Sequence, residues 1–131
     1  LISVWIMSRE WIDKLKRVFE ELGVSYEIEE AVRVHIDDLI IQLGEAEDGQ
    51  NINVSISVAL PSEDVSLEEV ERYAKSVEKA LKMAAMLKRG ELSYELDTSL
   101  PSYPMLYIVR RYSDKEALVE DFTNALRGLS S

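Results

Sequence analysis

Glycine is scarce in this chain of 131 residues, and its positions divide the sequence into elements. Gly23, Gly90 and Gly128 each follow an amphipathic run with helical spacing, and Gly44 and Gly49 bracket a polar turn between two alternating runs. Glycine commonly ends helices because it adopts the left-handed backbone conformation without a Cβ clash. All five glycines are therefore predicted to mark boundaries, and none remains for a glycine-rich loop that would hold a phosphate.

Three segments have apolar residues at helical spacing: residues 9–22, 67–89 and 114–127. Ser8 is expected to cap the first helix. Ser66 with Glu69 and Ser113 with Glu116 match the capping box of the other two. The second half of the middle helix is apolar nearly all round, which predicts burial on more than one side.

Apolar and polar residues alternate in the segments between these helices: residues 24–28 and 32–36 with an interruption at 29–30, then 39–43, 52–60, 92–97 and 103–112. Asp37 and Asp38 shift the phase of the alternation by one residue, which predicts a hairpin turn. We expect an α+β fold with the order α-β-β-β-α-β-β-α, in which helices pack on one face of an antiparallel sheet. Its length makes the chain a single domain, residues 1–131, and residues 1–7 are interpreted as a non-native or alternative-start extension.

The chain is strongly acidic, with a formal net charge of −10 at pH 7. Such a charge repels nucleic acids and anionic membranes, so neither is expected as a partner. The absence of cysteine excludes disulfides, thiolate metal sites and thiol catalysis. The chain has few Asn and Gln and many Glu, Lys and Arg, and this composition resembles that of proteins from thermophiles. A cytoplasmic location is the expected default.

Candidate catalytic residues are few. His35 is the only histidine, and it is interpreted as a surface or structural residue. Asp37 and Asp38 are the best candidates for a divalent-metal site, because carboxylates are the ligands that Mg²⁺ and Ca²⁺ prefer. The acidic turn after Gly44 does not match a calcium loop, since strand-patterned runs flank it and Ile56 stands where the bidentate Glu would be required. No cofactor is expected.

More apolar surface is present than one helix layer can bury. The strand at 103–112 is apolar on both faces. The second half of the middle helix is apolar nearly all round. A second copy of the chain in a symmetric dimer is the expected cover. The residues assigned to this dimer or partner interface are Val77, Leu81, Met83, Met86, Tyr103, Met105 and Tyr107.

Several segments resemble the type III secretion chaperone-like fold, which YbjN-like domains share. WIDKLKRVFEELGVSYEI resembles its first helix, VRVHIDDLIIQL its first hairpin, and SLEEVERYAKSVEKALKMAAML its central helix. The resemblance covers residues 9–129 at the level of the fold. It implies a homodimer, built by the central helix and the later strands, that binds extended or unfolded segments of partner proteins.

We therefore expect a non-catalytic, chaperone-like protein-binding module. Two alternatives are an enzyme that uses Asp37 and Asp38 to hold a divalent metal, and a regulatory or assembly subunit with no ligand of its own.

Overall fold

A computed structural model describes residues 10–62 and 64–130 of the chain. The predicted extension at residues 1–7 and the predicted cap Ser8 lie outside the described residues. The helices are α2 (Glu10–Leu22), α3 (Leu67–Met86) and α4 (Lys115–Ser130). The strands are β1 (Ser25–Ile28), β2 (Val32–Ile36), β3 (Leu39–Glu45), β4 (Ile52–Ala59), β5 (Glu91–Asp97) and β6 (Met105–Tyr112).

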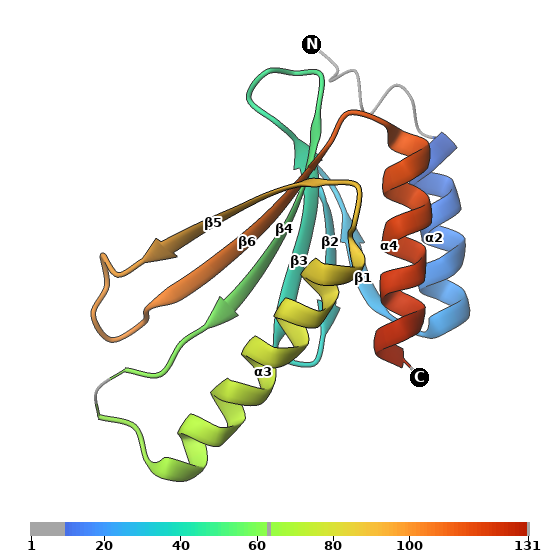
Figure 1. Cartoon of the computed structure of the whole chain (residues 1–131). Helices are drawn as coiled ribbons and strands as arrows, with labels where there is room; N and C mark the ends of the chain where they lie inside the picture. Colours follow the sequence, from blue (N-terminus) through green and yellow to red (C-terminus); the bar gives the residue numbers. More distant parts are fainter. Residues whose placement is uncertain (1–9, 63, 131) are drawn as a thin grey trace.

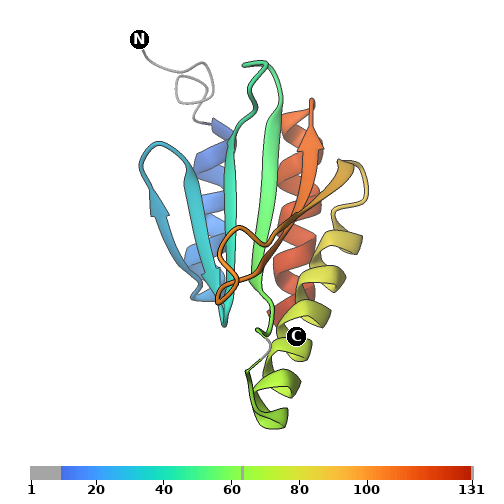
Figure 2. The same ribbon diagram turned by 90° about the vertical axis from the view of Figure 1, so that its left-hand side faces the viewer.

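The six strands form one antiparallel sheet in the order β1-β2-β3-β4-β6-β5. All three helices lie on one face of this sheet (Figures 1 and 2), which confirms the expected α+β class and the one-sided helix layer. The structure resolves the interrupted run at 24–36 into a hairpin of two strands, β1 and β2, so that four strands precede α3. Glu29 and Glu30 interrupt the alternation because they form the turn between those two strands.

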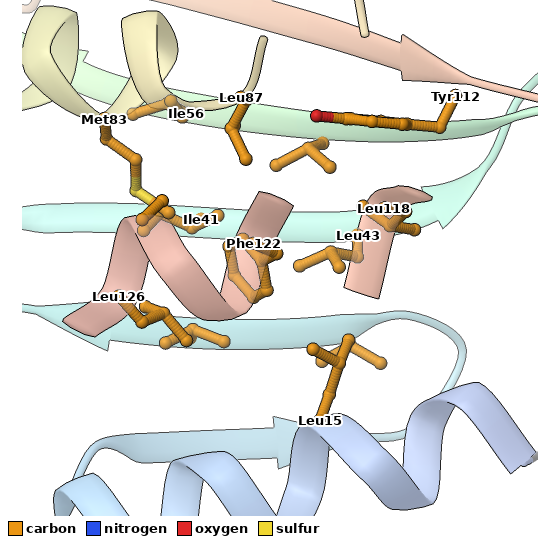
Figure 3. Close-up of a cluster of buried hydrophobic side chains, with 14 of the residues drawn as sticks. Leu15, Ile41, Leu43, Ile56, Met83, Leu87, Tyr112, Leu118, Phe122 and Leu126 are labelled. Atoms are coloured by element: carbon orange, nitrogen blue, oxygen red, sulfur yellow. The ribbon is translucent and has the colours of Figure 1, made fainter. Parts of the chain in front are cut away.

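The core lies between the sheet and the helices. Ile41, Ile56 and Ile108 are opposite one another on β3, β4 and β6, and all three are fully buried. Figure 3 shows Phe122 of α4 and Met83 of α3 in the same cluster of buried side chains. The strict alternation of β4 follows from this arrangement, because one side of that strand faces the helices.

The helix ends agree with the sequence in part. Ser66 caps α3 as predicted, because its hydroxyl accepts a hydrogen bond of 3.3 Å from the backbone N–H of Glu69. The predicted capping role of Ser113 is wrong. Asp114 accepts instead from the backbone N–H of Glu116 at 2.9 Å, and α4 begins one residue later than expected.

Two glycines lie inside elements, contrary to the prediction that all five mark boundaries. Gly44 lies within β3, and Gly128 lies within α4, which continues to Ser130. A Cβ atom on Gly128 would lie 2.8 Å from the sulfur of Met86, so this glycine lets α4 approach α3 closely. Gly23, by contrast, follows α2 with φ +68°, as expected of a helix-ending glycine.

The end of α3 is held from the sheet. Arg110 of β6 donates from Nε to the carbonyl oxygen of Ala84 at 2.9 Å and from Nη1 to that of Gly90 at 2.8 Å. A guanidinium at this position adds a hydrogen bond in the last turn of α3 and interacts favourably with the negative end of the helix dipole. No helix in the described residues is long and apolar enough to cross a membrane.

Candidate interaction surface

Exposed large apolar side chains are gathered in one part of the molecule. Of the nine among the described residues, only Ile40 lies outside the stretch from α3 to the start of β6. The other eight are Leu67, Val70 and Leu81 on α3, Leu92, Tyr94 and Leu96 on β5, and Leu100 and Tyr103 in the β5–β6 connection. Contiguous exposed apolar surface on a soluble protein commonly marks an interaction site.

The α3 part of this surface is a stripe at coiled-coil spacing, which we call the α3 stripe: Leu67, Val70, Ala74, Val77 and Leu81. These positions are separated by three and four residues, as in the a and d positions of a heptad. Val77 is half-buried, whereas the other four are exposed. The buried side of the helix adjoins the stripe: Ala80 and Met83 belong to the core, and Val77 packs against it. α3 therefore presents one apolar side to the sheet and another to solvent.

The β5 part is exposed because none of the helices that the structure describes covers it. α3 packs against β4 and β6, and β5 lies beyond them at the edge of the sheet (Figure 1). Leu92, Tyr94 and Leu96 lie opposite Arg110, Ile108 and Leu106 of β6, so they share the helix-bearing face of the sheet. Tyr94 and Leu96 remain 62 % and 60 % exposed, although Ile108 beside them is fully buried.

Within the described residues, no helix covers the other face of the sheet. Met105, Tyr107 and Val109 lie there on β6, and all three are half-buried. Tyr107 lies opposite Ser57 of β4 and Glu95 of β5. β6 is therefore apolar on both faces, although helices cover only one of them.

The seven residues predicted for the interface separate into three groups. Val77 and Leu81 belong to the α3 stripe, and Tyr103, Met105 and Tyr107 lie in the β5–β6 connection or on the open face of the sheet. Met83 is fully buried in the core, so its assignment to a surface is corrected. Met86 is half-buried against Gly128. The sequence missed Leu92, Tyr94 and Leu96, although their alternation with acidic residues could have indicated a half-covered strand.

The most chemically rich cluster in the described residues is centred on the buried carboxylate of Asp121. It accepts hydrogen bonds from the hydroxyl of Tyr112 at 2.8 Å and from the backbone N–H of Arg89 at 3.0 Å. The Arg89 guanidinium donates from Nη2 at 2.7 Å and from Nε at 3.1 Å. Every strong donor in the cluster is thus directed at one carboxylate, which is the arrangement of a structural clamp.

Titration of the clamp follows from its contacts. Burial alone would raise the pKa of Asp121, but the hydrogen bonds from Arg89 and Tyr112 outweigh it and hold that pKa below its usual range. Burial, together with the hydrogen bond to Asp121, raises the pKa of Tyr112. At neutral pH the carboxylate is therefore charged and the phenol is neutral, so neither is poised to transfer a proton.

Asp37 and Asp38 form the β2–β3 turn, as predicted, and Asp37 has a left-handed backbone with φ 51°. Asp37 is paired with Lys79 of α3, and Asp38 accepts a hydrogen bond of 3.4 Å from the hydroxyl of Ser76. Within residues 10–62 and 64–130, no group of three or more His, Asp or Glu side chains is arranged to hold a metal ion. The metal-dependent enzyme remains a prediction without a favouring observation.

The acidic turn between β3 and β4 uses its carboxylate for folding. Asp48 accepts from the backbone N–H groups of Gln50 and Asn51, each at 3.0 Å, and it is paired with Arg111. The two backbone N–H groups, followed by Arg111, hold the pKa of Asp48 far below its usual range. Because the Asp48 carboxylate is bound by groups of its own turn and by Arg111, the turn is interpreted as a hairpin connection.

No protein-family model matches the chain, and neither does any curated protein sequence. Among solved structures the chain is similar to YbjN from E. coli, with 16 % identity and a TM-score of 0.43 over 88 % of this chain and 87 % of that one. It is also similar to an uncharacterized protein from Methanothermobacter thermautotrophicus, with 18 % identity and a TM-score of 0.44 over 89 % and 90 % of the two chains. These are resemblances of fold alone.

Proposed function

We propose that this chain is a non-catalytic protein-binding module that forms a homodimer and binds extended segments of partner proteins. The observation that carries the proposal is the concentration of exposed apolar side chains on α3, on β5 and in the connection after β5. Large exposed apolar patches on soluble proteins commonly mark interaction sites.

The α3 stripe has the geometry of a self-complementary contact. Leu67 and Leu81 each lie seven residues from Ala74, and Val70 and Val77 lie four and three residues from it. Two antiparallel copies that cross at Ala74 would therefore place Leu67 against Leu81 and Val70 near Val77. A two-fold dimer requires this kind of reciprocal pairing. The small side chain of Ala74 at the centre allows the two helices to approach closely.

Self-association is tested by light scattering coupled to size-exclusion chromatography at roughly 5 to 100 µM. The wild-type chain is expected to be a dimer. Leu81→Glu should produce a monomer because it buries a charge in the stripe. Leu96→Glu is the matched control: it places the same charge on an exposed apolar residue of β5 and should leave the dimer intact. A wild-type monomer across this range contradicts the dimer.

Binding of extended segments is tested with reduced, carboxymethylated α-lactalbumin, which stays unfolded. Fluorescence anisotropy of the labelled protein should rise on addition of this chain. The triple variant Leu92→Ser, Tyr94→Ser and Leu96→Ser should lose most of that response, because it removes the exposed apolar side of β5. An unchanged response in the triple variant would remove β5 from the proposal.

A further inference from the structure

The two edges of the sheet differ in how they are protected. β1 is four residues long, and the acids Glu29 and Glu30 follow it immediately. β5 is seven residues long and leaves its apolar side chains in solvent. Short, charged edges resist pairing with other chains, whereas a long edge with an exposed apolar row invites it. β5 is therefore the edge at which another strand can add.

The two sides of β5 have opposite character. Leu92, Tyr94 and Leu96 lie on the helix-bearing face, and Glu91, Ser93, Glu95 and Asp97 lie on the open face. The strand carries three acids and no base. A strand that adds to β5 would place its own alternate residues beside these two rows.

The negative charge of this row has no ion pair within the described residues. Glu91 lies opposite Arg111 on β6, but Arg111 is paired with Asp48. Glu95 lies opposite Tyr107. Asp97 accepts hydrogen bonds from the backbone N–H and the hydroxyl of Ser99, and no cation contacts it in the described part of the chain.

Charge also disfavours a second copy of β5 as the added strand. Antiparallel pairing about Tyr94 would set Glu91 opposite Asp97, and pairing about Ser93 would set Glu91 opposite Glu95. Pairing about Glu95 would bring its two copies together. A shift by one residue would place leucines against carboxylates. Like charges directly opposite each other destabilise a strand pair, so the acidic row selects against self-pairing.

We infer that the free edge of β5 binds an extended segment that alternates Lys or Arg with apolar residues. Its apolar side chains lie beside Leu92, Tyr94 and Leu96, and its cations lie beside Glu91, Glu95 and Asp97. Main-chain hydrogen bonds supply much of the affinity in such strand addition, and the alternate side chains supply the specificity. This inference rests on the proposed function, because it names the chemistry of the extended partner.

The test uses fluorescein-labelled peptides of about nine residues, a length that spans the strand. One alternates Lys with Val, one alternates Thr with Val, one alternates Glu with Val, and a fourth has the Lys/Val composition with the lysines in one block. In low salt, anisotropy should give the alternating Lys/Val peptide a Kd about tenfold lower than that of the Thr/Val peptide. Each of the three cross-strand charge pairs is expected to increase the affinity about two- to threefold. The Glu/Val peptide should bind most weakly.

Two matched variants distinguish binding at β5 from non-specific attraction to an acidic protein. Glu91→Lys with Glu95→Lys should reverse the preference toward Glu/Val. Glu27→Lys with Glu29→Lys changes the net charge equally at the other edge of the sheet and should keep the preference for Lys/Val. Circular dichroism and thermal melting verify that both variants fold.

Hydrogen exchange locates the peptide: amides of β5 should be slowed by the alternating Lys/Val peptide, and amides of β1 should not. Equal binding of all four peptides, an equal loss in both charge variants, or no binding at all would overturn the inference. The α-lactalbumin and Leu81→Glu experiments report on the proposed function independently of that result. If α-lactalbumin binds but the peptides show no preference for Lys/Val, only the proposed partner chemistry is refuted, and the proposed function stands.

Discussion

Asp121 is the residue through which three separate segments are joined. It lies on α4, whereas Arg89 follows α3 and Tyr112 ends β6. Its side chain is only 9 % exposed, so its charge depends on those partners and not on water. The orientation of α4 against the sheet is thus fixed by a polar contact as well as by apolar packing.

Replacing Asp121 by Ala should lower the free energy of unfolding by about 2–4 kcal/mol. The variant leaves the buried hydroxyl of Tyr112 without its acceptor and removes an ion pair, but Arg89 is half-exposed and can recover water, which moderates the loss. Urea titration followed by circular dichroism measures the change. Glu120→Ala is the control, because Glu120 is an exposed neighbour 3.4 Å from Arg89 and should change stability by less than about 1 kcal/mol.

The same residue should make stability depend on pH in the acid range. The folded-state pKa of Asp121 lies below the value of about 3.9 expected in the unfolded chain. Its contribution is therefore fully present above that value and is lost as the pH falls through the folded pKa. Urea midpoints between about pH 6 and pH 3 should fall less steeply in Asp121→Asn than in the wild type. Glu120→Gln should retain the wild-type slope, and equal slopes in all three proteins would contradict the assignment.

At the scale of elements, the periodic segments were predictable from the sequence, whereas only some of their junctions were. β4 and α3 were anticipated because their patterns continue without a fault for many residues. The role of Gly128 was missed, because a glycine needed for close packing looks the same in a sequence as one that ends a helix. Asp121 was missed as well, since its partners come from segments distant in the chain.

The surface was predicted incompletely for a similar reason. The apolar excess of α3 was visible in the sequence, but which side faces solvent depends on where the helix lies under the sheet. Met83 looked equivalent to Leu81, yet Met83 is in the core and Leu81 is 45 % exposed. The exposure of β5 depends on the strand order, which places it beyond the reach of α3.

The junction between α3 and β5 depends on Gly90. A Cβ atom there would lie 2.7 Å from Cε2 of Tyr112 and 2.9 Å from Cβ of Arg110. Both neighbours are held by hydrogen bonds, so Gly90→Ala should destabilise the fold by about 1–3 kcal/mol. Gly44→Ala is the matched control, because its Cβ would meet Ala31 at an ordinary 3.6 Å. Thermal unfolding of both variants checks the prediction, which fails if the two substitutions have equal effects.

The whole molecule combines a large apolar surface with a net charge of −10. Two like-charged copies repel each other at a distance, and this repulsion opposes the apolar attraction of the α3 stripe. Added salt screens charges separated by more than about 10 Å at 0.1 M but leaves apolar contacts in place. Repulsion and apolar attraction therefore respond differently to ionic strength.

Raising NaCl from about 20 mM to about 500 mM should accordingly strengthen self-association, with a severalfold fall in the dimer dissociation constant measured by sedimentation equilibrium. Binding of the alternating Lys/Val peptide should change in the opposite direction, because salt screens the attraction between its lysines and the acids of β5. Leu81→Glu should show no dimer at either salt concentration, which assigns the effect to the α3 stripe. If the dimer weakens with salt, ion pairs and not apolar contacts join the two copies, and the α3 stripe is not the interface.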